Sequence, residues 1–118
     1  MKFIIRVGGM TFKTVGILSS GEVYLARLFT HGNPIRTIRV VNGTSTDNAP
    51  VIFNGDNTFS ILWFNIHYCK SNPREEGLFY LFIHRNGTLQ FALSFASHRS
   101  VNCHMTLEIL DGIYNGSS

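Results

Sequence analysis

The chain has 118 residues, of which 44% are apolar and 14% are charged, and its formal net charge is +3. This length is typical of one domain, and the charged fraction lies well below the roughly 25% of ordinary soluble domains, so we expect part of the apolar excess to face a partner. No segment approaches the roughly 18 uninterrupted apolar residues of a membrane span, and Arg6 interrupts the first apolar run too early for a signal peptide, so we expect no membrane insertion.

The positive charge is concentrated in the first third of the chain. Residues 1–40 contain six basic residues and one acidic residue. The basic residues are spread singly over several predicted strands, which favours a solvated face over a nucleic-acid-binding surface. We therefore expect no nucleic-acid partner for Lys2, Arg6, Lys13, Arg27, Arg36 and Arg39.

Apolar residues recur with a period of two between Gly, Asn and Pro residues, and no window keeps the spacing of an amphipathic helix. The pattern predicts an all-β fold, an antiparallel β-sandwich of about eight to ten short strands, with jelly-roll connections as one arrangement. We expect one domain over residues 1–118, with a flexible tail at 114–118. The predicted strands cover residues 2–7, 10–18, 22–30, 35–41, 50–53, 58–69, 78–85, 88–96 and 101–110.

The first third of the chain contains a glycine pair, one predicted tight turn and one candidate binding loop. Gly8-Gly9 leads into another strand and not into a helix, so these glycines are no phosphate-binding loop. Ser19-Ser20-Gly21 predicts a tight turn. The loop at 30–34 combines a histidine, an asparagine and a proline, which are residue types found in ligand-binding loops of β-sandwiches.

The strand predicted at 58–69 follows a turn at Asn54-Gly55-Asp56-Asn57 and is apolar on both faces. The strand at 78–85 has the same property. A two-layer sandwich covers only the inner face of each strand, so the second apolar face requires a covering loop or another subunit, and we favour a subunit. By analogy with other β-sandwich heads we expect a homotrimer whose interface contains Leu62, Phe64, Ile66, Tyr80 and Phe82.

The loop at 68–76 resembles the loop at 30–34 in composition, with asparagine, proline and charged residues after a tyrosine. Planar polar side chains beside an aromatic ring are suited to sugar binding, and Tyr68 or Tyr114 would supply the ring. Ordinary turn chemistry is the alternative interpretation of both loops. The candidate ligand-binding residues are His31, Asn33, Tyr68, Asn72 and Arg74.

The clearest hairpin joins the strands at 78–85 and 88–96 through Asn86-Gly87, which predicts a type I′ turn. The strands at 88–96 and 101–110 each place their large apolar residues on one face only. Asparagine-glycine pairs followed by Thr or Ser also form glycosylation motifs, and we interpret them first as turns. They are Asn42-Gly43-Thr44, Asn86-Gly87-Thr88 and Asn115-Gly116-Ser117.

Catalytic and metal-binding patterns are weak in this sequence. Cys69 and Cys103 lack metal-ligand spacing and are expected to be buried free thiols, with a single disulfide as the alternative. His67 and Cys69 share one strand face, and a zinc site there needs further ligands from neighbouring strands. These ligands would be His84, Cys103 or His104. No nucleophile motif is present, so we assign no catalytic residue, metal or cofactor.

Three functional hypotheses follow. The leading one is a non-enzymatic structural or recognition module that self-assembles, such as a capsid-associated virion protein or a receptor-binding fibre head that recognises a host-surface receptor. The second is a monomeric carbohydrate-binding module that uses the loops at 30–34 and 68–76. The third is a small enzyme with a cross-strand His/Cys site. Apart from the virion hypothesis, the sequence indicates no cellular location.

Overall fold

The computed structural model describes residues 1–19, 21–41, 49–67, 76–95 and 106–115. Within these ranges the chain forms ten antiparallel β-strands and no helix, so none of the described residues belongs to a helix long and apolar enough to cross a membrane. The all-β prediction is confirmed. The strands are β1 (Ile5–Val7), β2 (Met10–Phe12), β3 (Thr14–Ile17), β4 (Val23–Ala26), β5 (Pro34–Val41), β6 (Val51–Asn54), β7 (Thr58–His67), β8 (Glu76–His84), β9 (Leu89–Phe95) and β10 (Thr106–Ile113).

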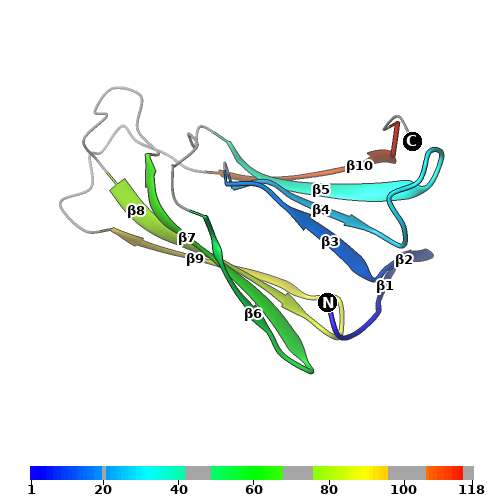
Figure 1. Ribbon diagram of the computed structural model, residues 1–118, viewed down its shortest axis with the longest axis horizontal. Helices are drawn as coiled ribbons and strands as arrows, with labels where there is room; N and C mark the ends of the chain where they lie inside the picture. The colour runs from blue at the N-terminus through cyan, green and yellow to red at the C-terminus, as the bar shows by residue number, and fades with distance from the viewer. Residues whose placement is uncertain (20, 42–48, 68–75, 96–105, 116–118) are drawn as a thin grey trace.

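Two four-stranded sheets form the two layers of a sandwich (Figure 1). One sheet, here the β5 sheet, has the strand order β10-β5-β4-β3, and the other, the β8 sheet, has the order β6-β7-β8-β9. Strands that follow one another in the chain pair within each sheet, and the described chain changes sheet between β5 and β6 and again between β9 and β10. A jelly roll changes sheet at most of its connections. The expected jelly-roll connections are therefore wrong, although the sandwich is confirmed.

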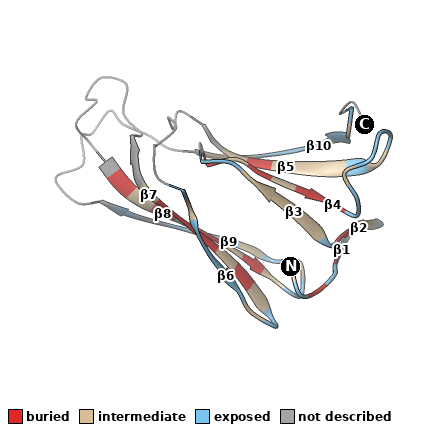
Figure 2. Ribbon diagram, in the orientation of Figure 1, coloured by how far each residue is buried: buried red, intermediate tan, exposed pale blue. Residues whose placement is uncertain are grey.

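The core lies between the two sheets and is built by alternate residues of the central strands, which Figure 2 shows as buried segments. The period of two predicts these faces correctly, because β7 and β8 pair in a register that aligns their inward side chains. The short β1–β2 sheet adds further apolar side chains to the same cluster. The buried cluster contains Phe3, Ile5, Phe12, Val23, Leu25, Ile38, Phe59, Ile61, Trp63, Phe79, Leu81 and Ile83.

The N-terminal hairpin differs from its prediction. The strand expected at 10–18 divides at Lys13, because β2 pairs with β1 whereas β3 pairs with β4. Gly8 and Gly9 form the two-residue turn between β1 and β2, with φ angles of 55° and 81°. Two successive positive φ angles define a type I′ turn, so this turn type occurs at the Gly-Gly pair.

The β8–β9 hairpin predicted at Asn86-Gly87 is confirmed, but its turn type is different. The His84 carbonyl accepts a hydrogen bond from the Gly87 amide (2.9 Å), and the His84 amide donates to the Thr88 carbonyl (2.9 Å). Gly87 has a φ of 92°. This pattern is a three-residue loop that ends in a left-handed glycine, so the predicted two-residue type I′ turn is wrong here.

The predicted turn before Gly21 is confirmed and follows the same pattern. The Gly21 amide donates to the Leu18 carbonyl (3.2 Å), the Leu18 amide donates to the Glu22 carbonyl (2.9 Å), and Gly21 has a φ of 94°. The Leu18 carbonyl also accepts a hydrogen bond from Nε1 of Trp63 on β7 (2.8 Å). This turn therefore ties one sheet to the other.

A bulge interrupts the alternation of β7. Trp63 pairs with Phe79 and Ile66 pairs with Gly77, so β7 has one more residue than β8 between the two pairs. A bulge shifts the residues after it by one position relative to the partner strand. Ile66 pairs with Gly77 beyond this bulge, and the expectation that its side chain shares a face with those of Leu62 and Phe64 stays a prediction.

Most remaining strand boundaries agree with the predictions to within about two residues. The strand expected at 22–30 ends at Ala26, and β10 extends to Ile113, whereas residues 101–105 of its predicted range lie outside the described residues. Tyr114, the first residue of the predicted tail, donates its amide hydrogen to the Asn33 carbonyl and accepts from the Gly32 amide, both at 2.9 Å. These bonds continue the β5–β10 pairing past the end of both strands.

Candidate functional site

A row of three rings lies on the outer face of β8, on the side opposite the core. Tyr80 and Phe82 are stacked with ring centroids 5.7 Å apart and an interplanar angle of 9°, and Phe82 and His84 follow at 6.5 Å and 16°. All three residues are half-buried. Since alternate residues of a strand point to the same side, the rings form one continuous ridge along β8.

Short side chains flank part of this ridge. Ser60 of β7 lies opposite Phe82 and Ala92 of β9 lies opposite Tyr80, whereas Gln90 of β9 and Leu62 of β7 occupy the other two positions beside these rings. Short neighbours do not reach over an aromatic ring, so they leave that side of it open to another molecule. The ridge is therefore open on the β7 side of Phe82 and on the β9 side of Tyr80.

The edge strand β6 widens this apolar surface. Val51 and Phe53 pair with Leu62 and Ser60 and so share the outer face. Val51 is 38% exposed and Phe53 is 54% exposed, although both are large apolar side chains. We use the name aromatic face for the outer face of the β8 sheet that contains Val51, Phe53, Leu62, Phe64, Tyr80, Phe82 and His84.

The aromatic face carries no formal charge over the registers from Leu78 to His84 of β8. The outer-face positions of the four strands in this described region contain no Asp, Glu, Lys or Arg. Exposed surfaces of soluble proteins normally mix apolar groups with charges of both signs. This stretch of the β8 sheet departs from that composition.

The outer face of the β5 sheet has the mixture of apolar, polar and charged residues that is usual for a protein surface. Nη2 of Arg39 donates to Oε1 of Glu108 across β5 and β10 (3.0 Å). The Tyr24 hydroxyl on β4 donates to the Glu22 carboxylate (2.8 Å), and this hydrogen bond raises the pKa of Tyr24. The two outer faces of one sandwich therefore differ in kind, one polar and charged and the other apolar and uncharged.

The residues predicted for a subunit interface lie mainly on the aromatic face. Phe64, Tyr80 and Phe82 are half-buried there, and Leu62 lies deeper, with 6% of its surface exposed. The side chain of Ile66 lies outside the described side chains, so its membership of this group stays a prediction. Whether the aromatic face contacts a subunit stays a prediction.

The loop at 30–34 is held partly by side-chain hydrogen bonds of the kind that are usual in turns. Nδ2 of Asn33 donates to the Leu28 carbonyl (3.2 Å) and to the Thr30 hydroxyl, so the side-chain amide closes the loop on itself. His31 is exposed at the tip. Tyr68, Asn72 and Arg74 lie outside the described residues, and their proximity to His31 stays a prediction.

The proposed cross-strand His/Cys site is visible only at His84. Its Nε2 forms a hydrogen bond with Oε1 of Gln90 (3.1 Å), and its Nδ1 forms one with the Thr58 hydroxyl (3.2 Å). Cys69, Cys103 and His104 lie outside the described residues, as does the side chain of His67. No three potential ligands from His, Cys, Asp and Glu come together among the described side chains.

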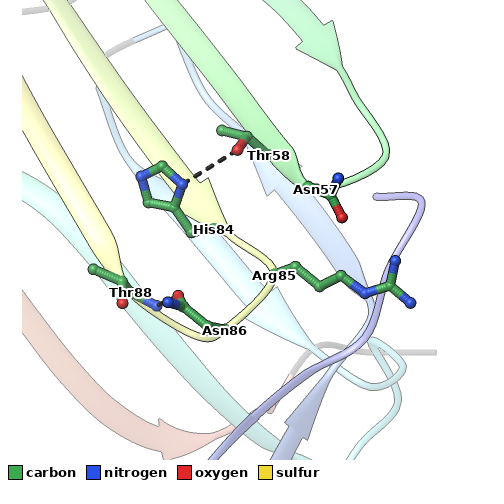
Figure 3. A pocket seen from close by; sticks show the side chains of 6 residues that line it. All are labelled: Asn57, Thr58, His84, Arg85, Asn86 and Thr88. Carbon is green, nitrogen blue, oxygen red and sulfur yellow. Dashed lines mark hydrogen bonds between the residues drawn. The ribbon is translucent and has the colours of Figure 1, made fainter.

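Two shallow pockets share Arg85 at the end of the sandwich where the β6–β7 and β8–β9 turns meet the N-terminal segment. The first, of about 470 Å³, is shown in Figure 3 and is lined by Asn57, Thr58, His84, Arg85, Asn86 and Thr88. The second, of about 500 Å³, is lined by Lys2, Phe3, Ile4, Arg6 and Arg85. Residue spacing alone did not predict these pockets, because Lys2 and Arg6 meet Arg85 only through the tertiary fold.

Backbone hydrogen bonds hold Arg85 in place between the two pockets. Its amide donates to the Asn57 carbonyl (2.8 Å), which joins the turns at the ends of β6 and β8. Oδ1 of Asn86 accepts from the Thr88 amide (2.9 Å). Gly87 packs against β1, since a Cβ atom at Gly87 would lie 3.0 Å from Cγ2 of Val7. The pocket walls are thus parts of bonded turns.

Comparisons of the chain with protein-family models, with curated proteins and with solved structures found no match. Function is consequently argued from the two surfaces described above, the aromatic face and the pair of pockets around Arg85. Fold alone does not indicate function, because sandwiches of this kind support many activities.

Proposed function

We propose that this protein is a non-enzymatic recognition module that associates with a second copy of itself through the aromatic face. The observation that supports this most is the contrast between the two outer faces. Arg39 and Glu108 form an ion pair on the outer face of the β5 sheet, whereas the aromatic face has no charged residue from Leu78 to His84. A sheet face that is always exposed to water usually contains charged residues, so their absence favours a face that is covered by a partner.

Burial of this face would be favourable. Removing apolar surface from water contributes about 25 cal/mol per Å². Phe53 and Val51 are exposed, and the stacked rings of Tyr80 and Phe82 each have one short neighbour, Ala92 and Ser60. Contiguous apolar patches on soluble proteins mark interaction sites more often than scattered apolar residues do.

A second copy is the partner that fits this composition most directly. An uncharged face is complementary to itself, and two β-sheets stack face to face about 10 Å apart without any charge to match. A single self-complementary surface can be buried completely in a two-fold symmetric dimer, in which the same surface of both subunits forms the interface. The geometry thus favours a dimer over the trimer expected from the sequence.

The size of the face sets the expected strength of this dimer. Strands about 4.8 Å apart that rise about 3.3 Å per residue give, from Leu78 to His84, a face of roughly 450 Å² in projection. Stable interfaces bury about 800 Å² on each partner. We therefore expect a reversible dimer that dissociates on dilution. A structural role in a virion, as a capsid-associated protein or fibre head, is one setting in which high local concentration would favour such an interface.

Matched substitutions on the two outer faces test this proposal. Phe53→Lys places a charge on the aromatic face, and Leu110→Lys places the same charge on the outer face of the β5 sheet, where Leu110 is 45% exposed. Sedimentation equilibrium over a range of concentrations measures the mass of each variant. We expect the unmodified chain and Leu110→Lys to approach twice the 13.3 kDa chain mass as concentration rises, and Phe53→Lys to remain at 13.3 kDa.

Two results would refute the proposal. One is a monomer at every concentration for the unmodified chain. The other is equal weakening of association by both substitutions, since that result would place the interface elsewhere or reduce it to a general charge effect. Circular dichroism of both variants should match the unmodified chain, because each replaced side chain is exposed on an edge strand.

A further inference from the structure

Three cationic side chains from two distant parts of the chain line one pocket. Lys2 and Arg6 come from the N-terminal segment, and Arg85 comes from the β8–β9 turn. No acidic residue lines this pocket among the described residues. Like charges brought together by a fold repel one another, and an anion placed between them removes that repulsion.

Ion pairing within the described part of the chain leaves most of this charge available. Its ion pairs are Arg36 with Asp111, Arg39 with Glu108, and Lys2 with Asp56, so neither Arg6 nor Arg85 takes part in one. The Lys2 pair is long, at 3.9 Å, and both side chains are more than half exposed. Such a contact contributes little and is easily replaced by a ligand.

The neighbouring pocket adds groups that are polar but uncharged. Arg85 lines both pockets, and in Figure 3 Asn57 lies on one side of it and Asn86 and Thr88 on the other, with Thr58 and His84 completing the lining. Amide and hydroxyl groups donate and accept hydrogen bonds with equal ease, which matches the hydroxyl groups of sugars. Each pocket has a volume in the range of about 300–1,000 Å³ that is usual for ligand sites.

We propose that these two pockets together bind an acidic oligosaccharide, with its carboxylate or sulfate group between Lys2, Arg6 and Arg85 and an adjoining sugar ring against Asn57, Asn86 and Thr88. Arginine favours this placement, because its planar fork of donors pairs with two oxygens of an anionic group at once. A nucleic acid would also be attracted by the charge. The cationic pocket lacks its second requirement, since its one aromatic residue, Phe3, is buried and offers no exposed ring for base stacking.

Calorimetric titration of the full chain tests this site with four probes. They are a sulfated heparin-derived tetrasaccharide, a sialylated trisaccharide, its neutral desialylated counterpart, and a single-stranded oligonucleotide. We expect at least one acidic saccharide to bind and the neutral one not to bind. Binding of the sulfated probe alone, or of the sialylated probe alone, identifies which anionic group the site accepts.

Arginine substitutions separate a defined site from general charge attraction. Arg85→Gln and Arg6→Gln should each weaken saccharide binding about ten- to hundredfold, since each removes a charge-assisted hydrogen bond. Arg39→Gln removes the same charge from the outer face of the other sheet and should leave affinity within about twofold. Both pocket side chains are exposed, so folding should be retained.

Several outcomes would overturn the proposal. These are the absence of binding by both acidic saccharides, equal binding of the neutral saccharide, equal weakening by Arg39→Gln, and tighter binding of the oligonucleotide than of either saccharide. The last result would make the pocket a nucleic-acid contact. His84 lines the polar pocket and also belongs to the aromatic face, but none of the substitutions in the two experiments changes it. Loss of dimerisation in Phe53→Lys and loss of saccharide binding in Arg6→Gln or Arg85→Gln are therefore distinguishable.

Discussion

Replacement of Gly87 by alanine tests the packing of the β8–β9 turn against the N-terminal hairpin. Gly87 has a φ of 92°, in the region that L-residues rarely adopt. An added Cβ atom would lie 3.0 Å from Cγ2 of Val7 and 3.5 Å from Cγ2 of Ile5. The substitution therefore introduces both backbone strain and a steric contact with β1.

Gly32 separates these two effects, because it is a glycine of nearly the same conformation without the contact. Its φ is 89°, and an added Cβ atom would meet nothing within 4 Å. A non-glycine residue at positive φ costs roughly 1–2 kcal/mol, and the reduced freedom of the unfolded chain returns part of that cost. We expect Gly32→Ala to lower the free energy of unfolding by about 1 kcal/mol.

Gly87→Ala should cost more than Gly32→Ala. Overpacking a closely packed region typically adds about 1–3 kcal/mol, so the total should reach about 2–4 kcal/mol. Urea unfolding followed by circular dichroism measures both values, with the midpoint as the readout. Val7→Ala removes the nearest atoms, so its combination with Gly87→Ala should cost about 1 kcal/mol less than the sum of the two single substitutions.

The reasoning fails if Gly32→Ala and Gly87→Ala cost the same, because the contact with Val7 would then have no energetic effect. It also fails if the effects of Val7→Ala and Gly87→Ala are additive. Additivity would mean that the turn and β1 do not touch in solution.

Two further predictions concern single hydrogen bonds. Trp63→Phe removes the donor to the Leu18 carbonyl and should lower the free energy of unfolding by about 2 kcal/mol. Circular dichroism is the readout, because Trp63 is the only tryptophan and its replacement removes the tryptophan fluorescence signal. An unchanged urea midpoint would contradict the hydrogen bond between the sheets. Arg36 donates to both carboxylate oxygens of Asp111 (2.7 and 3.1 Å), and this hydrogen bonding lowers the pKa of Asp111. A lowered folded-state pKa stabilises the protein above the unfolded pKa of about 3.9, and this effect declines as the pH falls below that value and through the folded one. Asp111→Asn should therefore cost about 0.5–1 kcal/mol at pH 7 and less at pH 2. A cost that is the same at both pH values would contradict this pairing.

Alternation and turn residues were sufficient to predict most strands, their buried faces and the positions of the tight turns, although not the turn type at Asn86-Gly87. The inward side chains of β7 and β8, such as Phe59 and Phe79, follow from a period of two, since each strand residue points to the side opposite its neighbour. The hairpin at Asn86-Gly87 follows from the tolerance of these residues for turn conformations. The second apolar face of β8, with Tyr80 and Phe82, was also predicted from the sequence pattern.

Long-range features required the tertiary structure. The bulge between Trp63 and Ile66 leaves no mark in the alternation, because the extra residue is defined only against the partner strand. The strand order of the two sheets depends on where β10 returns, beside β5, which no local pattern specifies.

Of the two candidate surfaces, one was determined by the sequence and the other by the tertiary structure. The apolar character of the aromatic face is a property of single strands, so the sequence alone determined it. The cationic pocket brings Lys2 and Arg6 close to Arg85. Only the tertiary structure determined this proximity, because contact between residues so far apart in the chain depends on loop closure and packing.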